Sequence, residues 1–482
     1  MLRLLFAFLL FISYSSSLPQ PYDTIVVGMG SAGTTAASTL ARAGRRVLAL
    51  EAQDRIGGRV KTIPFGDGTV EEGAEWIHGT ENSVVYQLGV DNHIDLRTHN
   101  TSNNVVKSDG SLLDRETMID LALFCLTGLG EPPKEPIGLG NFTTIRVKEY
   151  LNEKYPALAN DEKFLKGFLF MMNVVVTNYE SCNDWNDATA QTGAQDLGGD
   201  QVMSWHKYGY KTFFELLLNT YNNGPGLPNL DIKLNTEVTQ IKWPRDASGN
   251  VEVVCKDGST YTASNVIVTV SLGVLKEIYA TLFSPDLPQT KIFAIDNISF
   301  GAVAKVILSF SEVWWSHGQF DYLLWWNEDD LQRLSDDEKW ISYVAEISTP
   351  AGSNNTVTLW FTGDRAKLVE SLPDDVVKSF CMKILRQFLG KNFTLTEPDA
   401  MIISSWYSNP YVRGAYSYDN LQTPLHPHIR DDLAAPLVDA AGTPRVLFAG
   451  EATSRIHFAT VHGASETGKR EALRLLQTSI NV

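Results

Sequence analysis

The feature that most constrains this chain is a glycine-rich turn between a strand and a helix near the N-terminus. Residues 25–27 are an unbroken β-branched run, which is typical of a strand buried on both faces. Gly28, Gly30 and Gly33 follow with the spacing G-x-G-x-x-G. Such glycines permit a tight turn, let backbone approach a pyrophosphate and let the helix pack closely on the strand. The pattern predicts an α/β unit with a dinucleotide site, and an ordinary strand–helix turn is the alternative.

The segment after this turn adds an acid and an arginine that fit the same nucleotide. A second apolar strand over 47–50 ends at Glu51, whose carboxylate can accept hydrogen bonds from both ribose hydroxyls. Gly58 and Arg59 follow in an Ile-Gly-Gly-Arg run that could bring backbone and a guanidinium to the pyrophosphate. The predicted cofactor contacts of this region are Gly28, Gly30, Ser31, Ala32, Gly33, Glu51, Ala52, Gly58 and Arg59.

Composition and charge limit the kinds of molecule that the protein is expected to bind. The chain has 482 residues, of which 44% are hydrophobic and 20% charged, as in a globular protein of about two or three domains. Acids outnumber bases, 56 against 40, and the formal charge is −16. Because such a surface repels nucleic acid and attracts cations, we predict no nucleic-acid partner.

The cysteines do not indicate a metal or redox centre. No C-x-x-C pair occurs among Cys125, Cys182, Cys255 and Cys381, and no metal site is predicted. A chain of this size folds without disulfides, so the sequence leaves open both disulfide pairing and four buried thiols.

The N-terminus has the pattern of a secretory signal. Arg3 precedes an apolar run over 4–12, which is too short to span a bilayer, and small residues follow before Leu18. We predict a signal peptide over 1–17, with an uncleaved anchor as the alternative, and a secreted mature chain without a transmembrane segment. Glycosylation sequons that agree with export begin at Asn100, Asn141, Asn297, Asn354 and Asn392.

Two inserts interrupt the nucleotide-type pattern. The first, over 91–228, is predicted to be largely helical, with helices near 118–126, 147–151, 164–172 and 213–221. Strands are expected next at 232–234, 238–243, 251–255 and 265–270. The second insert, over 291–400, is expected to hold strands at 303–310, 341–347 and 357–361 and a helix at 374–389. A strand at 445–449 and a helix at 464–476 close the chain.

The C-terminal block resembles a known family. Residues 447–453 read Leu-Phe-Ala-Gly-Glu-Ala-Thr, and 458–464 read Phe-Ala-Thr-Val-His-Gly-Ala, so a helix N-terminus lies close behind a strand. With the Gly-Gly-Arg after Glu51, this block resembles the flavin amine oxidase family over nearly all of the chain beyond the signal peptide. The resemblance implies an α/β fold: a Rossmann-like FAD-binding domain from 18–90, 229–290 and 401–482, and an interleaved α+β substrate domain from 91–228 and 291–400.

The resemblance also implies how FAD is held. Glu451 is expected at the ribityl chain, the backbone of Thr460 and Val461 at the flavin ring, and the backbone of Val238 at the adenine. Further expected cofactor contacts are Gly73, Ala74, Glu75, Trp76 and Gly450. We expect noncovalent FAD, because no cysteine follows Cys381.

Two residues are predicted to be catalytic. Lys305 lies inside the apolar β pattern 303–308, where an ammonium is costly unless it is paired or functional, with an edge-strand lysine as the alternative. The family resemblance implies that Lys305 holds a water beside the flavin N5, and methionine of similar volume is expected to replace it without loss of folding. His78, in Trp-Ile-His-Gly, resembles the form in spermine oxidases and would bind a substrate amine or tune its protonation; a structural histidine is the alternative.

The resemblance further implies a set of substrate contacts. Tyr416 would be one aromatic wall of a cage that steers the amine to the flavin, with ordinary packing as the alternative. The opposite wall is usually a tyrosine, but His457 and Phe458 stand there, so the cage is altered. The predicted substrate contacts are Tyr416, Thr460, His457, Glu180 and Ser181.

These features together predict a secreted FAD-dependent polyamine oxidase, similar to spermine oxidases. It would oxidise spermine, spermidine or their N-acetylated forms with O2 to an aldehyde, a shorter amine and H2O2. An L-amino-acid oxidase is one alternative and would need an arginine for the substrate carboxylate, for which Arg413 is the candidate. A non-catalytic secreted flavoprotein is another, against which Lys305 and the complete FAD motif argue.

Overall fold

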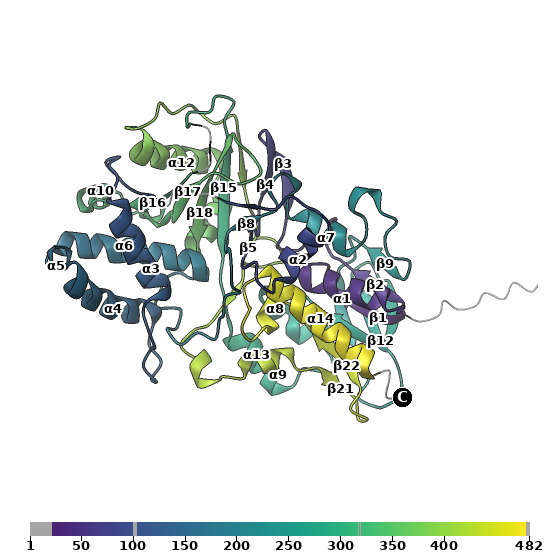
Figure 1. The fold of residues 1–482 in the computed structure, drawn as a ribbon. Coiled ribbons are helices and arrows are strands. Elements are labelled where there is room, and N and C mark those ends of the chain that lie inside the picture. Colours follow the sequence, from purple (N-terminus) through teal and green to yellow (C-terminus); the bar gives the residue numbers. More distant parts are fainter. Residues whose placement is uncertain (1–21, 100–103, 317, 319, 479–482) are drawn as a thin grey trace, which may run out of the picture.

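The computed structural model describes residues 22–99, 104–316, 318 and 320–478. The predicted signal peptide over 1–17 and the sequon at Asn100 lie outside the described residues. Two sheets with their helices stand side by side, one carrying α1 and α14 and the other carrying α6 and α12 (Figure 1).

The first sheet carries the nucleotide-type elements. Its centre is β1 (Tyr22–Val27), which pairs in parallel with β2 (Val47–Leu50) and with β12 (Thr260–Val268). The remaining strands are β9 (Leu230–Lys233), β10 (Val238–Lys242), β11 (Val251–Cys255), β13 (Phe283–Ser284), β21 (Leu437–Val438) and β22 (Pro444–Phe448). The order β13-β10-β11-β12-β1-β2-β9, with β22 on β12, brings three separated segments of the chain into one sheet.

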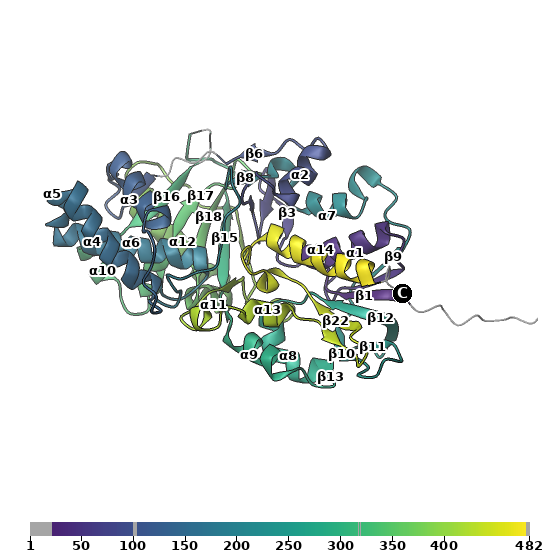
Figure 2. The ribbon, with the colours of Figure 1, turned by 60° about the horizontal axis from the view of Figure 1, so that its bottom comes forward.

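Two helices cover one face of this sheet. The helices α1 (Ser31–Arg42) and α14 (Val461–Thr478) run side by side (Figures 1 and 2). A Cβ built on Gly468 would lie 2.0 Å from the carbonyl oxygen of Ala32, so the two backbones come as close as glycine allows. This approach places the N-terminus of each helix beside the other, since Ser31 Oγ donates to Val461 O at 2.9 Å.

The second sheet has six strands in the order β19-β15-β18-β17-β16-β7. They are β19 (Ala400–Ile403), β15 (Val303–Ser309), β18 (Thr356–Thr362), β17 (Glu346–Ser348), β16 (Asp321–Trp325) and β7 (Asn104–Lys107). Alternate residues such as Val306 and Leu359 form one apolar core with α11 (Asp364–Ser371) and α12 (Asp374–Leu389). The opposite face meets α6 (Glu162–Glu180) near Trp325.

The predicted helical insert is present, with bounds set by the structure. Its helices are α3 (Arg115–Thr127), α4 (Leu139–Lys154), α5 (Pro156–Ala159), α6 and α7 (Lys211–Leu217), while α2 (Val84–Asp91) precedes it. The helix α7 packs with Ile77 and Val85, close to α1 and α2, so the end of the 91–228 segment lies on the nucleotide-sheet side. The domain boundaries themselves stay predictions.

Two strand predictions differ from the structure. The strand expected at 341–347 is instead a 3-10 turn, η3 (Lys339–Tyr343), followed by the short strand β17. The strand expected at 265–270 is the second half of a longer strand, β12, which begins at Thr260 because it pairs with β11 first and with β1 and β22 further along.

The remaining helices were not predicted individually. They are α8 (Leu272–Leu282), α9 (Gln289–Asn297), α10 (Glu328–Arg333) and α13 (Ile429–Ala434). The smaller strands are β3 (Thr62–Phe65), β4 (Gly68–Glu71), β5 (Trp76–Ile77), β6 (Arg97–Thr98), β8 (Met203–Ser204), β14 (Ser299–Phe300) and β20 (Ser417–Tyr418).

All four cysteines are free and buried. Of the two alternatives that the sequence left open, the structure therefore has four buried thiols and not disulfide bonds. Across the part of the chain that the structure describes, no helix has the length and apolarity needed to cross a bilayer.

Candidate active site

The glycine-rich turn has the geometry that phosphate binding requires. Gly28 has φ +94°, and a Cβ built on Gly33 would lie 1.9 Å from Gly28 O, so both positions exclude side chains. A Cβ on Gly30 would instead meet its first neighbours at 3.9 Å, at Gly57 and Gly58. The N-terminus of α1 therefore faces a gap between backbone segments, where its free amides can bind an anion.

Glu51 stands at the end of β2, as the sequence predicts. Its Oε2 accepts from Met29 N at 2.7 Å and its Oε1 from Gln53 N at 2.9 Å, which fixes the carboxylate. Burial raises the pKa of Glu51, while those two amides oppose the rise. Each oxygen keeps a second lone pair that a ribose hydroxyl can use.

The segment that precedes Val238 lies against this acid. Thr236 N donates to Glu51 O at 2.8 Å, and Val238 then begins β10. A surface cavity of about 510 Å³ opens here, lined by residues that include Ala52, Asn235 and Asn409. The adenosine end of a dinucleotide that follows Glu51 would enter this region.

Arg59 and Glu451 join the two glycine-containing blocks. Arg59 Nη1 lies 2.8 Å from Glu451 Oε1 and 2.6 Å from Ala415 O. Glu451 also accepts from Ser417 Oγ at 2.7 Å and from Ala459 N at 2.9 Å. Burial opposes ionisation of Glu451, but Arg59 and these donors overcome it and hold the pKa of Glu451 below its usual range.

The start of α14 supplies a second helix N-terminus. Thr460 Oγ1 accepts from Gly463 N at 2.9 Å and donates to His457 O at 2.8 Å, so its hydroxyl caps the helix. Its contact with substrate stays a prediction. The first amides of α14, including that of Val461, have no acceptor within their own helix. The ring of His457 also has a hydrogen-bond partner within the protein, since its Nδ1 lies 2.7 Å from Glu466 Oε2.

These residues fit FAD. Gly450 has φ +133°, and a Cβ built there meets nothing within 4 Å, which leaves open space beside Glu451. Gly73 is held close to Arg59, since its built Cβ would lie 2.0 Å from Arg59 O, and Ala74 N donates to the same oxygen at 3.1 Å. A dinucleotide needs hydrogen-bond donors for its phosphates and an acceptor for its ribose. The N-termini of α1 and α14 and the guanidinium of Arg59 are such donors, and the buried carboxylate of Glu51 is such an acceptor.

Lys305 is buried and ion-paired at the junction of the two sheets. Its Nζ lies 2.7 Å from Glu75 Oε2 and 2.9 Å from Glu71 O, and 4.1 Å from the ring centroid of Trp360. The side chains of Lys305 and Glu75 are 2% and 6% exposed. The alternative of an edge-strand lysine reaching water is therefore wrong, because β15 lies between β18 and β19.

His78 and Trp76 lie on the segment that carries Glu75. Burial lowers the pKa of His78, so the ring is neutral near pH 7. Its Nδ1 lies 2.9 Å from Gln201 O, so Nδ1 carries the proton and Nε2 remains as an acceptor. The ring of Trp76 packs on that of His99, with centroids 4.5 Å apart.

Tyr416 and Glu180 lie together at the end of α6. Tyr416 Oη donates to Asn178 O at 2.8 Å, and burial followed by the charge of Glu180 raises the pKa of Tyr416. Burial also raises the pKa of Glu180 to about 7, with Asp419 adding to the rise. Ser181 differs from its prediction: it is fully buried and donates to Tyr416 O at 3.2 Å, so it holds backbone rather than presenting a hydroxyl to substrate.

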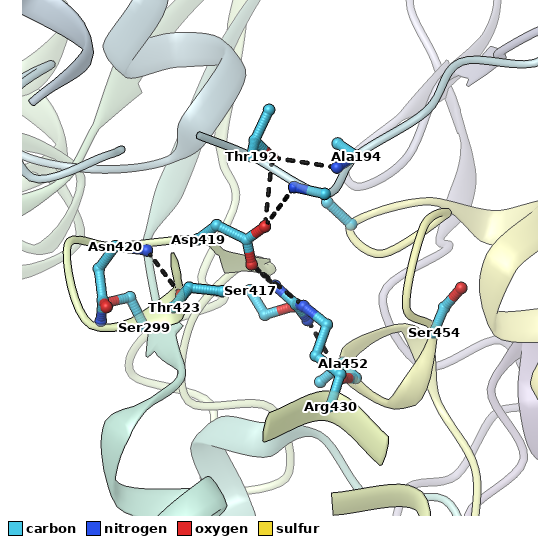
Figure 3. A network of polar contacts seen from close by, with 12 residues as sticks. Thr192, Ala194, Ser299, Ser417, Asp419, Asn420, Thr423, Arg430, Ala452 and Ser454 are labelled. Carbon is cyan, nitrogen blue, oxygen red and sulfur yellow. Dashed lines mark hydrogen bonds and ion pairs between the residues drawn. The ribbon is translucent and has the colours of Figure 1, made fainter. Parts of the chain in front are cut away.

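A buried polar network, shown in Figure 3, connects this region to the FAD block. Arg430 pairs with Asp419 at 2.9 Å and donates to Ser417 Oγ and Ala452 O. The other oxygen of Asp419 accepts from Thr192 Oγ1 at 3.2 Å and from Gly193 N at 3.0 Å. The sequence analysis missed this network, because nothing local marks Arg430 or Asp419 as buried.

No metal centre is present among the residues that the structure describes. Within 22–99, 104–316, 318 and 320–478, no three His, Cys, Asp or Glu side chains come close enough to hold an ion.

Comparison with known proteins agrees with this geometry. The profile of the flavin containing amine oxidoreductases matches residues 31–166 and 187–476. The chain belongs to this family. It is 30% identical to "Probable polyamine oxidase 5" of Arabidopsis thaliana, with 94% of this chain and 98% of the relative covered. It is also 30% identical to the proteins named peroxisomal N(1)-acetyl-spermine/spermidine oxidase of Bos taurus and Homo sapiens, with 94% of each chain covered.

Family membership confirms several predictions. The protein is an FAD-dependent amine oxidase with the α/β fold of its family, and FAD is its cofactor. The individual site residues stay predictions that the geometry places, and noncovalent attachment of FAD stays a prediction as well.

The Lys305–Glu75 pair changes the expected result of replacing the lysine. Lys305→Met leaves a buried, unpaired carboxylate, so we expect a loss of about 3–5 kcal/mol in the free energy of unfolding. The double variant Lys305→Met/Glu75→Gln should recover most of that loss. The turnover of both the single and the double variant should stay below that of the wild type, by about 10²–10⁴-fold at most. Denaturant unfolding and turnover of the FAD-loaded proteins measure the two effects.

The matched control is the half-exposed pair Lys61–Glu72, whose side chains are 34% and 10% exposed. Breaking it with Lys61→Met should cost about 1 kcal/mol or less. If Lys305→Met were no less stable than this control, the ion pair would not support the fold as described.

Proposed function

We propose that this chain is a secreted FAD-dependent polyamine oxidase, which oxidises spermine, spermidine or their N-acetylated forms with O2 to an aldehyde, a shorter amine and H2O2. The observation that carries the proposal is the carboxyl of Glu180 next to Tyr416, together with the neutral imidazole of His78, three residues after the Glu75 that pairs with Lys305. Acids and aromatic rings are what a flexible organic cation needs for binding. The names of the curated relatives support the same class of substrate.

The protein residues have separate tasks in this reaction. Bound FAD supplies the acceptor for the hydride of the amine and passes the electrons to O2. The reacting amine must be neutral, and the free Nε2 of His78 can accept a hydrogen bond or proton from it. Glu75 compensates the charge of Lys305, so that the ammonium at the flavin does not repel a cationic substrate.

The amino-acid oxidase alternative has less support. Its candidate carboxylate ligand, Arg413, donates through Nη2 to Glu277 at 3.0 Å on the solvent side of α8. The guanidinium is thus held by an acid away from Tyr416. A non-catalytic flavoprotein could replace both Lys305 and Glu75 by apolar residues of similar volume without loss of stability.

The substrate class is tested by H2O2 release from the purified protein. Spermine, spermidine, their N1-acetyl forms, phenylalanine and leucine are compared by kcat/KM under the same conditions. We expect a polyamine to exceed either amino acid by at least about tenfold, since a site that leaves a buried polar group unpaired rejects the wrong ligand strongly. Faster oxidation of phenylalanine or leucine would establish the alternative instead.

The role of Glu180 predicts a pH effect. A carboxyl with pKa about 7 is mostly neutral at pH 6 and mostly ionised at pH 8, whereas a primary amine keeps its proton over this range. Binding of a polyamine should therefore strengthen as the pH rises through 7, and Glu180→Gln should remove that gain. The ratio of KM values, variant over wild type, should rise roughly tenfold from pH 6 to pH 8.

This ratio isolates Glu180, because deprotonation of the reacting amine affects both enzymes equally. The control is Glu162→Gln, an exposed acid at the start of the same helix, α6. A ratio that does not change with pH would show that Glu180 does not hold an ammonium.

The N-terminal signal-peptide pattern and the glycosylation sequons support the proposal that the protein is secreted. The side chains of Asn141, Asn354 and Asn392 are exposed in the structure, so glycans could be attached there. Expressed in eukaryotic cells, the full chain should appear in the medium, begin near Leu18 and lose mass on endoglycosidase treatment. A matched chain without 1–17 should stay inside the cell. Retention of the full chain in an organelle, as the names of two relatives would suggest, would contradict the proposal.

A further inference from the structure

Three apolar side chains lie exposed at the surface around the end of α9. Phe293 is 39% exposed, although the other side of the same helix is buried. Leu421 and Leu425, on the segment that precedes α13, are 39% and 57% exposed. The helices α9 and α13 pack side by side (Figures 1 and 2). We call Phe293, Leu421 and Leu425 the apolar patch. Single exposed apolar residues need no explanation, whereas a group of them marks a site of contact.

The segment 420–426 is attached to α9 at both of its ends. Near its end, the ring of His426 lies edge-on to that of Phe293, with centroids 4.7 Å apart. At its start, Asn420 Nδ2 donates to Asn297 O at 2.9 Å. Because the two leucines of the apolar patch lie between these contacts, they border the same surface as Phe293.

A glycosylation sequon stands inside this surface. Asn297, Ile298 and Ser299 read Asn-Ile-Ser, and Asn297 is the last residue of α9. Residues four apart on a helix share a face, so Asn297 stands beside Phe293. The half-buried amide of Asn297 is also bonded to that turn, since its Nδ2 donates to Phe293 O at 2.8 Å. This bond uses one hydrogen of the amide and leaves the other free to be replaced.

A sugar on Asn297 would begin next to the ring of Phe293. The first sugar of an N-glycan, N-acetylglucosamine, is joined through its C1 to Nδ2, and the remaining N–H can still donate to Phe293 O. The sugar carries a face of C–H groups and an acetyl methyl. Such groups pack on the negative face of an aromatic ring, and they remove apolar surface from water.

We propose that Asn297 is glycosylated during export and that the first N-acetylglucosamine of its glycan covers the apolar patch. The proposal rests on the export that is part of the proposed function. It adds to export one occupied position and a structural task for the glycan there, which is to keep the apolar patch from contact with other proteins.

The sugar comes from an oligosaccharide that is linked to a lipid diphosphate. The bond between Nδ2 of Asn297 and C1 of the sugar forms, and the bond between C1 and the diphosphate oxygen breaks. The lipid diphosphate leaves, and a base of the transferase takes the proton of Nδ2. In the folded chain Ser299 belongs to β14, opposite Tyr418, and its Oγ accepts from Asn420 at 2.8 Å. Because the transferase recognises this hydroxyl, the transfer precedes the formation of β14.

Occupancy is tested on the full chain, expressed in eukaryotic cells and purified from the medium with FAD bound. An amidase that removes whole N-glycans in heavy-oxygen water converts each occupied asparagine to labelled aspartate, which peptide mass spectrometry detects. We expect label at Asn297 in most molecules, and its loss in Asn297→Gln. The matched control is Asn392→Gln, because Asn392 also lies near the end of a helix, α12, and donates through Nδ2 to Gly110 O at 2.7 Å.

The contact with the ring is tested by removing the glycans from the folded, FAD-loaded protein. Complete removal should lower the melting temperature of wild type by about 2 °C more than that of Phe293→Ser, as for the loss of one aromatic contact in a large chain. Asn392→Gln should behave as wild type does, and Asn297→Gln as Phe293→Ser does. Trimming each glycan to its first sugar should leave the melting temperature of wild type unchanged. Binding of an apolar dye should rise only after complete removal.

The outcomes separate this inference from the proposed function. If another sequon is labelled and Asn297 is not, or if complete removal affects wild type and Phe293→Ser equally, the inference is overturned and export stands. If the full chain stays inside the cell and no sequon is labelled, export and the inference both fail. Oxidation of polyamines by the purified protein is decided by H2O2 release and does not depend on either result.

Discussion

The buried ion pair of Lys305 and Glu75 is the interaction on which the architecture of the site depends. Lys305 belongs to β15, an inner strand of the six-stranded sheet between β19 and β18, and Glu75 lies just before β5. Their contact at 2.7 Å, together with that of Lys305 to Glu71 O, ties the six-stranded sheet to the segment that carries Glu71 and Glu75. Burying either charge alone would be costly, so each half of the molecule is complete only in the presence of the other.

The other buried charges around the cofactor site are likewise paired with an opposite charge within the protein. Arg59 neutralises Glu451, 392 residues further along the chain, and Arg430 neutralises Asp419, 11 residues before it. Ser417 donates to Glu451 and accepts from Arg430, so the two pairs share one hydroxyl. The result is a rigid polar frame around the open space next to Gly450, in which the charge of every member is compensated by a protein group.

Sequence reasoning succeeded where the signal is local and failed where it is tertiary. The glycine turn, Glu51 and the Gly450–Glu451 block could be predicted, because each role follows from a strand, a turn and a helix that are neighbours in the chain. Lys305 could be recognised as unusual from its apolar strand, but its partner lies 230 residues away and only the fold brings them together. The family resemblance placed Ser181 at the substrate together with Glu180, whereas its left-handed backbone at φ +56° turns its hydroxyl onto Tyr416 O.

The buried acids of this structure fall into two groups, those with a cationic partner in the protein and those with a raised pKa. Acids that serve the fold, such as Glu75, Asp419 and Glu451, each have a cationic partner within the protein. Glu180 and Glu346 instead have raised pKa values of about 7, because burial disfavours their charge and neighbouring acids add to that effect. A carboxyl in this state gains most from a cation that arrives with its own charge, whereas an anionic or neutral ligand leaves it protonated or repelled. In the proposed function, the charge of these two carboxyls is compensated by the substrate, which would favour an extended polycation over an amino acid.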